Sequence, residues 1–299
     1  MKLSIAVVTM NRVKQLIEAL QSCIDCIIPE DTEFVIIDNA STDDTAVAVE
    51  QFFVNHRYYY YYYERLEENI GCGNGRNYAY SKSHGDYIYF LDDDAYIDTS
   101  KNRDFFKSAI KILDDNSQIK TLTTQIYDLV WKKDRVDSIG PKIADDLYKV
   151  YMFCGGSHFL KKDFFKNTRP YYANKYGYEE IFPSLSVYNE GFVNAFTSEL
   201  LIIHNPLVNK WSEKSKGGIR LAATGMAQTF LMRSALFPVL LKPLNFLALF
   251  ARLVSRMSWD LTTNTVSIIR NTTIDKRGKA TLKYSTVFKL FHDFRFSIF

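Results

Sequence analysis

The sequence has few cysteines, four in 299 residues, and they do not form a zinc-binding pattern. Cys23 and Cys26 make a C-x-x-C, but no second pair or histidine cluster lies near them, and the surrounding LIEALQSCIDCIIP has the period of an amphipathic helix. We interpret both as small helix residues. Sparse cysteine favours a reducing compartment, and the N-terminal MKLSIAVVTM starts as a strand without a signal-peptide pattern, so we expect a cytoplasmic protein.

The sequence also lacks a strong charge of one sign. Its net charge is +3, and no uniformly basic stretch with interleaved aromatics occurs, so we expect no nucleic-acid partner. Neither G-x-G-x-x-G nor a Walker loop is present, and neither a dinucleotide cofactor nor ATP is indicated.

No long hydrophobic run is uninterrupted. Residues 234–251, SALFPVLLKPLNFLALFA, are strongly apolar, but Pro238, Lys242 and Pro243 break the run, whereas a spanning helix needs ~20 apolar residues. We interpret this region as a pair of amphipathic helices that lie on a membrane surface. A helical packing face or a dimer interface is the alternative, so an oligomer remains open.

The first half of the chain alternates strand-like and helix-like segments. Apolar, β-branched runs at LSIAVVT, EFVIID and DYIYFL read as buried strands, and the tyrosines 58–63 read as a further strand. Helical patterns cover 13–28, AVAVEQFF and RNYAYSKS, while 121–204 reads as a mixed sheet extension. This alternation predicts an α/β fold with a doubly wound, mostly parallel sheet.

Polar residues follow the strands at their carboxyl ends, where such sheets bind ligands. Thr9, Asn11 and Arg12 end the first strand, and Asp38 and Asn39 end the second. A carboxylate there can accept a hydrogen bond from the imide N–H of a nucleobase, although turn formation alone also explains Asp and Asn at strand ends. We expect these clusters to converge.

Asp92, Asp93 and Asp94 follow DYIYFL, and three adjacent carboxylates repel one another unless a cation compensates. Mn²⁺ and Mg²⁺ take carboxylate oxygens together with substrate phosphates. Strand alternation would place Asp92 and Asp94 on one side and Asp93 on the other. We predict Asp94 as a direct metal ligand and Asp92 at the donor or at the metal. A solvated acidic turn is the alternative.

The segment ENIGCGNGRN contains three glycines in five residues, which would let a loop approach a ligand closely before a helix begins. Asn69, Gly71 and Arg76 are the candidates for donor contact in this segment. A flexible turn without a ligand is the competing interpretation.

Taken in order, SIAVVTMNR, VIIDNASTDDT, ENIGCGNGRN and GDYIYFLDDDAYID resemble the motifs of the inverting family 2 glycosyltransferases of the GT-A fold. The resemblance covers about two-thirds of the chain. It implies a catalytic domain over residues 1–212 and leaves 213–299 as a mainly helical C-terminal region. It also implies a metal-dependent, hexosyltransferase-type enzyme that uses a nucleoside diphosphate sugar.

The resemblance assigns roles to individual residues. Asp38 would contact the uracil or thymine of a UDP or dTDP donor, and Glu180, paired with Glu179, would be the general base. The pair departs from the family's Glu-Asp, and Phe182 follows where another polar residue is usual. His204 would be a second metal ligand, or else structural. The donor-binding set is Thr9, Asn11, Arg12, Asp38, Asn39, Asn69, Gly71, Arg76, Asp92 and Asp93, and the metal set is Asp94, Asp92 and His204.

The acceptor implied by this resemblance is a glycan or lipid-linked glycan used in cell-surface polysaccharide synthesis. A peripheral position at the cytoplasmic face of the inner membrane would suit it. Two other functions stay open: a sugar nucleotidyltransferase, whose glycine-rich signature after the first strand is missing here, and an inactive relative that only binds the donor or a polysaccharide.

Overall fold

The computed structural model describes residues 2–58, 60–135, 139–165, 169–174, 177–206, 216–274 and 281–298. The chain separates into two units, one of Met1–Val187 with Phe192–Leu207 and one of Tyr188–Gly191 with Val208–Phe299. The boundary predicted between residues 212 and 213 lies outside the described residues.

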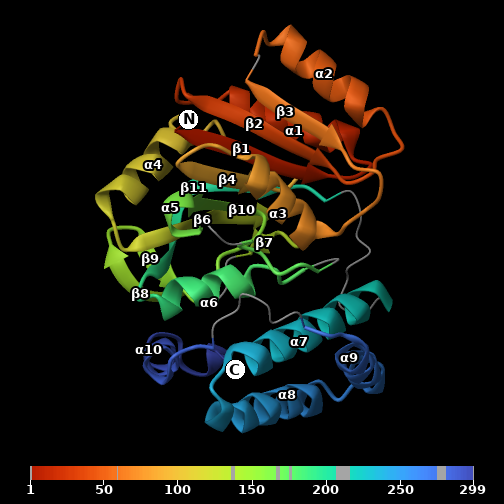
Figure 1. Cartoon of the computed structure of the whole chain (residues 1–299), viewed down its shortest axis with the longest axis vertical. Coiled ribbons are helices and arrows are strands. Elements are labelled where there is room, and N and C mark those ends of the chain that lie inside the picture. Colours follow the sequence, from red (N-terminus) through yellow and green to blue (C-terminus); the bar gives the residue numbers. More distant parts are fainter. Residues whose placement is uncertain are drawn as a thin grey trace. The chain divides into compact units, whose positions relative to one another are not determined.

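The first unit is built on one large sheet (Figure 1). Along the chain its strands are β1 Leu3–Thr9, β2 Thr32–Asp38, β3 Tyr61–Arg65, β4 Tyr87–Leu91, β5 Ala95–Ile97, β6 Ile119–Asp128, β7 Lys133–Asp134, β8 Ile139–Ala144, β9 Leu147–Val150, β10 Ser157–Lys161 and β11 Val193–His204. They lie in the order β3-β2-β1-β4-β10-β6-β11-β9-β8, with β5 paired to β11 and β7 to β6.

Strand register brings the polar ends of the strands together. β3, β2, β1 and β4 are parallel, and Thr9 at the end of β1 is level with Asp38 at the end of β2. β10 runs antiparallel between β4 and β6, and β6 is parallel to β11, so that Asp128 and His204 are partners at their ends. The carboxyl ends of β1, β2 and β4 therefore share one edge.

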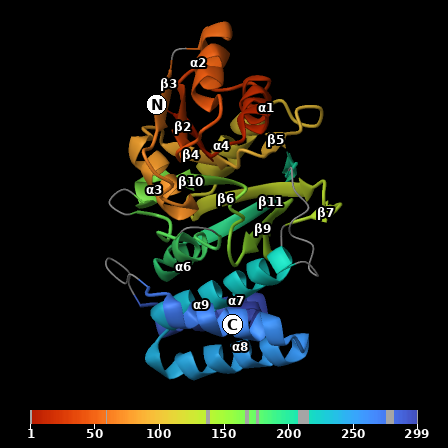
Figure 2. The same cartoon turned by 90° about the vertical axis from the view of Figure 1, so that its right-hand side faces the viewer.

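Helices cover both faces of this sheet (Figures 1 and 2). They are α1 Val13–Ile24, α2 Thr45–Asn55, α3 Cys72–Lys82, α4 Phe105–Asp115, α5 Lys162–Phe165 and α6 Ile181–Asn189. Because successive strand residues point to opposite faces, Ile5 and Tyr89 pack in the core with α1, α2 and α4, whereas Ala6 and Ile88 pack in the core with α3 and α5. The predicted α/β fold with helices on both faces of a mostly parallel central sheet is confirmed.

The glycine-rich segment differs from its prediction as a loop, because α3 already begins at Cys72. Gly71 precedes the helix with a φ of 87°, a conformation that favours glycine. A Cβ on Gly73 would lie 1.9 Å from the carbonyl oxygen of Tyr172, and one on Gly75 would lie 2.8 Å from Val8. Gly73 and Gly75 therefore let α3 pack closely against its neighbours.

Two other elements are shorter than predicted. α1 ends at Ile24 rather than at residue 28, so Cys26 follows the helix, although Cys23 and Cys26 are both buried in the core. The tyrosine-rich strand β3 begins only at Tyr61. Tyr59 lies outside the described residues.

The second unit is helical in the part that the structure describes. Its elements are α7 Lys216–Leu236, the 3₁₀ turn η1 Val239–Leu241, α8 Lys242–Arg256, α9 Trp259–Asn271, α10 Tyr284–Phe294 and the 3₁₀ turn η2 Arg295–Ile298. The predicted C-terminal helices are thus confirmed. Among the described residues, no helix is both long enough and apolar enough to span a membrane.

Helix α8 has an inverted distribution of polar and apolar side chains. Asn245 is its buried residue, and its amide donates to the carbonyl oxygen of Phe230 at 2.9 Å and to Ser234 Oγ at 2.7 Å, both on α7. The large apolar side chains are exposed instead. Those on or beside α8 are Val239, Leu240, Leu244, Phe246, Leu247, Phe250, Val254 and Met257, which are 46 to 93% exposed, and we call them the α8 apolar face.

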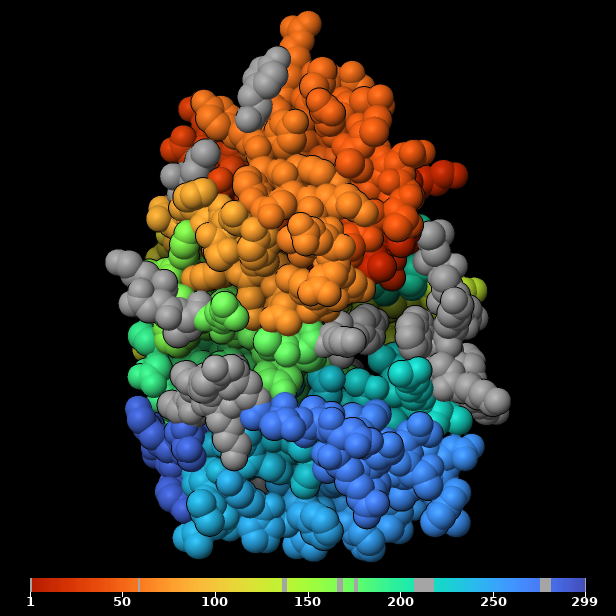
Figure 3. All heavy atoms as spheres, turned by 45° about the vertical axis from the view of Figure 1, so that its right-hand side comes forward, coloured from red at the N-terminus to blue at the C-terminus, as the bar shows by residue number. Residues whose placement is uncertain are grey.

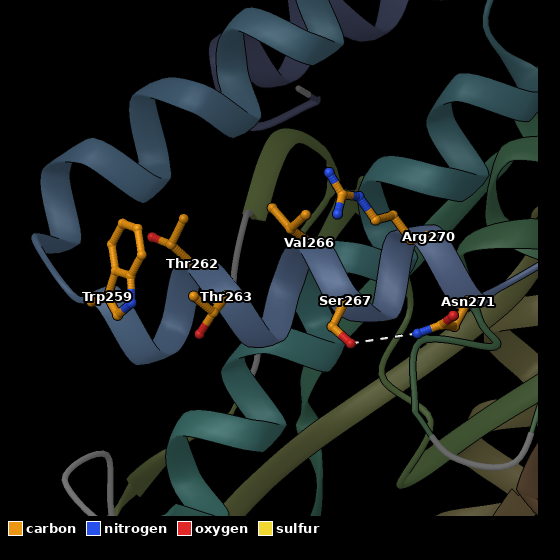
Figure 4. A pocket seen from close by; sticks show the side chains of 7 residues that line it. All are labelled: Trp259, Thr262, Thr263, Val266, Ser267, Arg270 and Asn271. Atoms are coloured by element: carbon orange, nitrogen blue, oxygen red, sulfur yellow. Dashed lines mark hydrogen bonds between the residues drawn. The ribbon is translucent and has the colours of Figure 1, made fainter.

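A groove of about 500 Å³ runs along α9 (Figure 4). All of its lining residues belong to that helix: Trp259, Thr262, Thr263, Val266, Ser267, Arg270 and Asn271. None of them is an acid, a histidine or a cysteine. Its lining therefore offers no carboxylate, imidazole or thiol for metal binding or for proton transfer at neutral pH.

Candidate active site

The three aspartates after β4 have different partners. Asp93 is buried, accepts a hydrogen bond from Thr9 Oγ1 at 2.8 Å, and forms an ion pair with Arg12 Nη1 at 2.8 Å. Burial and the neighbouring charge of Asp94 raise the pKa of Asp93 to about 6, although Arg12 and Thr9 act in the opposite direction. Asp93 thus ties the ends of β1 and β4 together.

Asp94 contacts a different set of groups. One of its oxygens lies 2.7 Å from Arg12 Nη1, and the other lies 3.3 Å from His204 Nε2. Burial would raise the pKa of Asp94, but the hydrogen bond and charge of His204, together with Arg12, lower it. Asp94 is therefore held as a carboxylate with a nitrogen ligand beside it.

Asp92, Asp94 and His204 could hold a metal ion. Each offers one ligand atom, and these atoms lie within 4.8 Å of one another. Two carboxylates and an imidazole are donors that suit Mn²⁺ or Mg²⁺, with phosphate oxygens completing the coordination. The donor set therefore fits a divalent cation.

Two further charged side chains surround this group. Asp128, at the end of β6, accepts a hydrogen bond from His204 Nδ1 at 2.8 Å. The Nε of Arg135 lies 4.0 Å from Asp128, and its buried Nη1 has no hydrogen-bond partner among the described residues. Burial opposes the charged form of Arg135, but nearby groups, including Asp92, Asp128 and Asp94, raise its pKa.

Arg76 is the centre of a second, deeper cluster. Its side chain is buried, and Nη1 lies 2.5 Å from Glu179 and 3.1 Å from Glu180. Nη2 lies 2.7 Å from Asp92 and donates to the carbonyl oxygen of Gly155 at 2.9 Å. One guanidinium thus connects the acidic end of β4 to the start of α6.

Glu180 is buried beside this guanidinium. Burial and the charge of Glu179 raise its pKa to about 8, against the opposing effect of Arg76. A Cβ on Gly155 would lie 1.7 Å from Glu180 Oε1, so only glycine leaves space for the carboxylate there. Glu179 also accepts a hydrogen bond from Cys72 Sγ at 3.1 Å.

Asp38 lies at the neighbouring strand end and is fully buried. Its Oδ1 accepts from the backbone N–H of Ser41 at 2.7 Å, and its Oδ2 accepts from the Tyr63 hydroxyl at 2.7 Å. The amides of Asn39 and Asn69 are joined at 2.9 Å and hold the following loop. The edge near Asp38 is therefore a closely hydrogen-bonded turn.

The structure brings most of the sequence-predicted residues to one edge of the sheet. Thr9, Arg12, Asp93, Asp94 and His204 are linked directly, and Asp92 offers a ligand atom within 4.8 Å of those of Asp94 and His204. Asn11, Asn39, Asn69 and Gly71 form the surrounding loops, where Asn11 Oδ1 accepts from the Thr42 N–H and Asn69 Oδ1 from the Gly71 N–H. Arg76 is buried and forms ion pairs with carboxylates such as Asp92, so it does not lie on a ligand-facing loop.

Sequence reasoning missed Asp128, Arg135 and Tyr63. Asp128 ends a largely buried strand as Asp38 does, but the strand reads IKTLTTQIYD and lacks the apolar run that marked the strand before Asp38. Arg135 follows a polar turn and carries no comparable pattern. Tyr63 is one of several adjacent tyrosines, which gave no reason to select it.

The Arg76 cluster predicts a charge-dependent loss of stability. In Arg76→Met the buried carboxylates lose their cation, which should lower the free energy of unfolding by about 3–5 kcal/mol. The loss should be smaller at pH 5 than at pH 8, because protonation removes the uncompensated charge. Urea denaturation at both pH values measures the free energy of unfolding. The control is the exposed Lys107→Met, which should stay within about 0.5 kcal/mol of the unmodified protein. An equal loss at both pH values would mean that packing, not charge, is the cause.

The chain is similar to known proteins in sequence. The family model described as glycosyl transferase family 2 matches residues 4–169. The poly(ribitol-phosphate) beta-N-acetylglucosaminyltransferase TarS of Staphylococcus aureus strain Mu50 is 34% identical over 119 residues, which are 39% of this chain and 19% of that protein. The match thus spans about a fifth of that relative's length.

Solved structures are similar in fold. S. aureus TarS 1-349 in complex with UDP-GlcNAc has a TM-score of 0.60 at 18% identity, covering 89% of this chain and 79% of that one. The mannosyltransferase PcManGT from Pyrobaculum calidifontis, in complex with GDP-Man and Mn²⁺, has a TM-score of 0.61 at 17% identity, covering 91% and 76%. With the matching family model and the acidic strand-end site, the chain belongs to glycosyl transferase family 2.

Proposed function

We propose that the chain transfers a hexosyl group from a UDP or dTDP donor to a hydroxyl of a glycan acceptor, with inversion at the anomeric carbon. One observation carries the proposal: Arg76 contacts both Asp92 and the buried candidate base Glu180. Asp92 is at the same time part of the metal-suited group that it forms with Asp94 and His204. The structures of similar fold that hold UDP-GlcNAc, or GDP-Man with Mn²⁺, support a nucleoside diphosphate sugar as the donor class.

The donor would lie along the carboxyl ends of β1, β2 and β4. The turn that Asp38 holds through Ser41 and Tyr63 would face the base, and Arg12, whose side chain is 44% exposed, would meet the diphosphate. Asp92, Asp94 and His204 would hold Mn²⁺ or Mg²⁺, which, when bound, stabilises negative charge on the leaving diphosphate.

Glu180 would take the proton of the acceptor hydroxyl. As the acceptor oxygen forms its bond to the anomeric carbon, the bond from that carbon to the diphosphate oxygen breaks, and the proton passes to Glu180. One such displacement inverts the configuration without a covalent intermediate. Arg76 and Glu179 would set the position and charge of Glu180.

The acceptor that we propose is lipid-linked, and the second unit would hold the enzyme at the cytoplasmic face of a membrane. The α8 apolar face is exposed, while the helix turns Asn245 inward. Atoms of α8 and α9, drawn in blue, lie at the surface in the space-filling view (Figure 3). Residues 216–298 carry thirteen lysines and arginines against three aspartates, which suits anionic lipid.

A donor screen tests the transferase proposal. Purified protein is mixed with UDP-, dTDP- and GDP-sugars, with and without Mn²⁺, and followed by diphosphate release and thermal stabilisation. We expect UDP or dTDP sugars to act only with metal and Asp94→Ala to abolish this, while the exposed Asp115→Asn behaves as the unmodified protein. Metal-dependent binding without turnover would favour the inactive binding protein. Formation of a nucleotide sugar from a nucleoside triphosphate would favour the nucleotidyltransferase.

The raised pKa of Glu180 predicts the pH dependence. A general base must be deprotonated, so kcat/KM should rise with pH and reach half of its plateau near pH 8. Glu180→Gln should lower kcat about 10²–10⁴-fold. The exposed Glu190→Gln is the control. A profile unchanged in Glu180→Gln would remove this residue from the mechanism.

Membrane binding is tested by co-sedimentation with phosphatidylcholine vesicles, with and without phosphatidylglycerol. Binding should need the anionic lipid and weaken as salt is raised. Leu247→Ser with Phe250→Ser should weaken it about 10²-fold, because two large apolar side chains no longer enter the lipid. The equally exposed pair Val47→Ser with Val54→Ser, on α2, should have no effect. A dimer that the α8 variant converts to monomer, without vesicle binding, would assign the face to a protein interface instead.

A further inference from the structure

Asp128 and His204 are held side by side by the sheet itself. β6 and β11 are parallel, and these two residues are register partners at the strand ends. Asp128 is 2% exposed, and its Oδ2 lies 2.8 Å from His204 Nδ1. The contact is therefore built on two strands and not on a mobile loop.

The other oxygen of Asp128 is occupied as well. Oδ1 accepts the backbone N–H groups of Val130 at 2.9 Å and Trp131 at 2.8 Å. Backbone N–H groups can only donate, so this oxygen must stay an acceptor. An ionised carboxylate can only accept as well, which requires that Nδ1 of His204 carries a proton.

The remaining nitrogen of His204 points at the metal-suited group, because Nε2 lies 3.3 Å from Asp94. Without a metal, Nε2 faces the Asp94 carboxylate at 3.3 Å and can donate a proton to it, whereas a metal bound there needs the Nε2 lone pair. Of the two neutral tautomers, the one with its proton on Nδ1, which Asp128 accepts, is the one that offers this lone pair. The orientation and the tautomer of the ring therefore both depend on Asp128.

We propose that Asp128 is a positioning residue that fixes His204 in the tautomer able to bind the metal. The proposal rests on the metal site of the proposed function and adds the group that makes His204 a competent ligand. Asp128 itself need not touch the metal or the donor.

Two substitutions separate this role from simple support of the turn. In Asp128→Asn the amide oxygen would accept from Val130 and Trp131, so the NH₂ group would face His204 Nδ1. Nδ1 must then accept, and the ring proton moves to Nε2, where it blocks ligation. Asp128→Ala loses the turn contacts but leaves the ring free to choose either tautomer. Of the two variants, Asp128→Asn should therefore be the more stable protein but the weaker metal binder.

The measurement is a Mn²⁺ titration in the presence of UDP, with free Mn²⁺ followed by electron paramagnetic resonance. We expect Asp128→Asn to weaken Mn²⁺ binding about 100-fold and Asp128→Ala about 10-fold. In urea denaturation, Asp128→Asn should be the more stable of the two. Asp146→Asn is the matched control, because Asp146 similarly accepts backbone N–H groups from Ser198 and Glu199, both at 2.9 Å or less, but contacts no histidine in the described structure.

The outcomes distinguish this inference from the metal site on which it rests. His204→Ala should also weaken Mn²⁺ binding. If His204→Ala weakens Mn²⁺ binding and Asp128→Asn does not, the positioning role is overturned. It is also overturned if the less stable of the two Asp128 variants is the one that binds Mn²⁺ more weakly. If His204→Ala binds Mn²⁺ as the unmodified protein does, His204 is not a ligand, and the proposed metal site fails together with the inference.

Discussion

The buried guanidinium of Arg76 is the interaction on which the arrangement of the site depends. It forms ion pairs with carboxylates from two separate parts of the chain, Asp92 after β4 and the pair Glu179 and Glu180 at the start of α6. Its single positive charge compensates only part of theirs, and the pKa of Glu180 remains raised to about 8. Without a cation, carboxylates this close and this buried would repel one another or take up protons. The guanidinium has a fixed planar geometry, so it also fixes the distance between the groups that it joins.

That spacing gives the site two sides. Asp92 belongs both to the Arg76 cluster and to the group that could hold a metal, and it contacts Nη2, whereas Glu180 contacts the other terminal nitrogen, Nη1. A leaving diphosphate and an attacking hydroxyl require separate positions on either side of the anomeric carbon. Gly155 leaves the space that the Glu180 carboxylate occupies, because any side chain at position 155 would displace Glu180.

Much of this could be predicted from the sequence, because parallel strands end at one edge of their sheet. The apolar runs located β1, β2 and β4, and the polar residues that follow them had to converge. The burial of Arg76 could not be predicted, since its acidic partners Glu179 and Glu180 lie more than a hundred residues away. Asp128 and His204, 76 residues apart, likewise meet only through the β6–β11 register.

Helix α8 shows a further limit of sequence patterns. An apolar stripe on a helix ordinarily faces the core of its own domain. Sequence periodicity predicts that the stripe exists, but it does not predict whether the stripe packs inside the domain or faces outward. Here Asn245 takes the inward position because Phe230 and Ser234 of α7 offer it two acceptors. A polar residue satisfied inside leaves the apolar side chains outside, where each large one gains about 1.5–3 kcal/mol only when a partner removes it from water. The two hydrogen bonds of Asn245, at about 0.5–1.5 kcal/mol each, are too weak to account for leaving so many apolar side chains in water. The α8 apolar face therefore points to a partner outside the described residues.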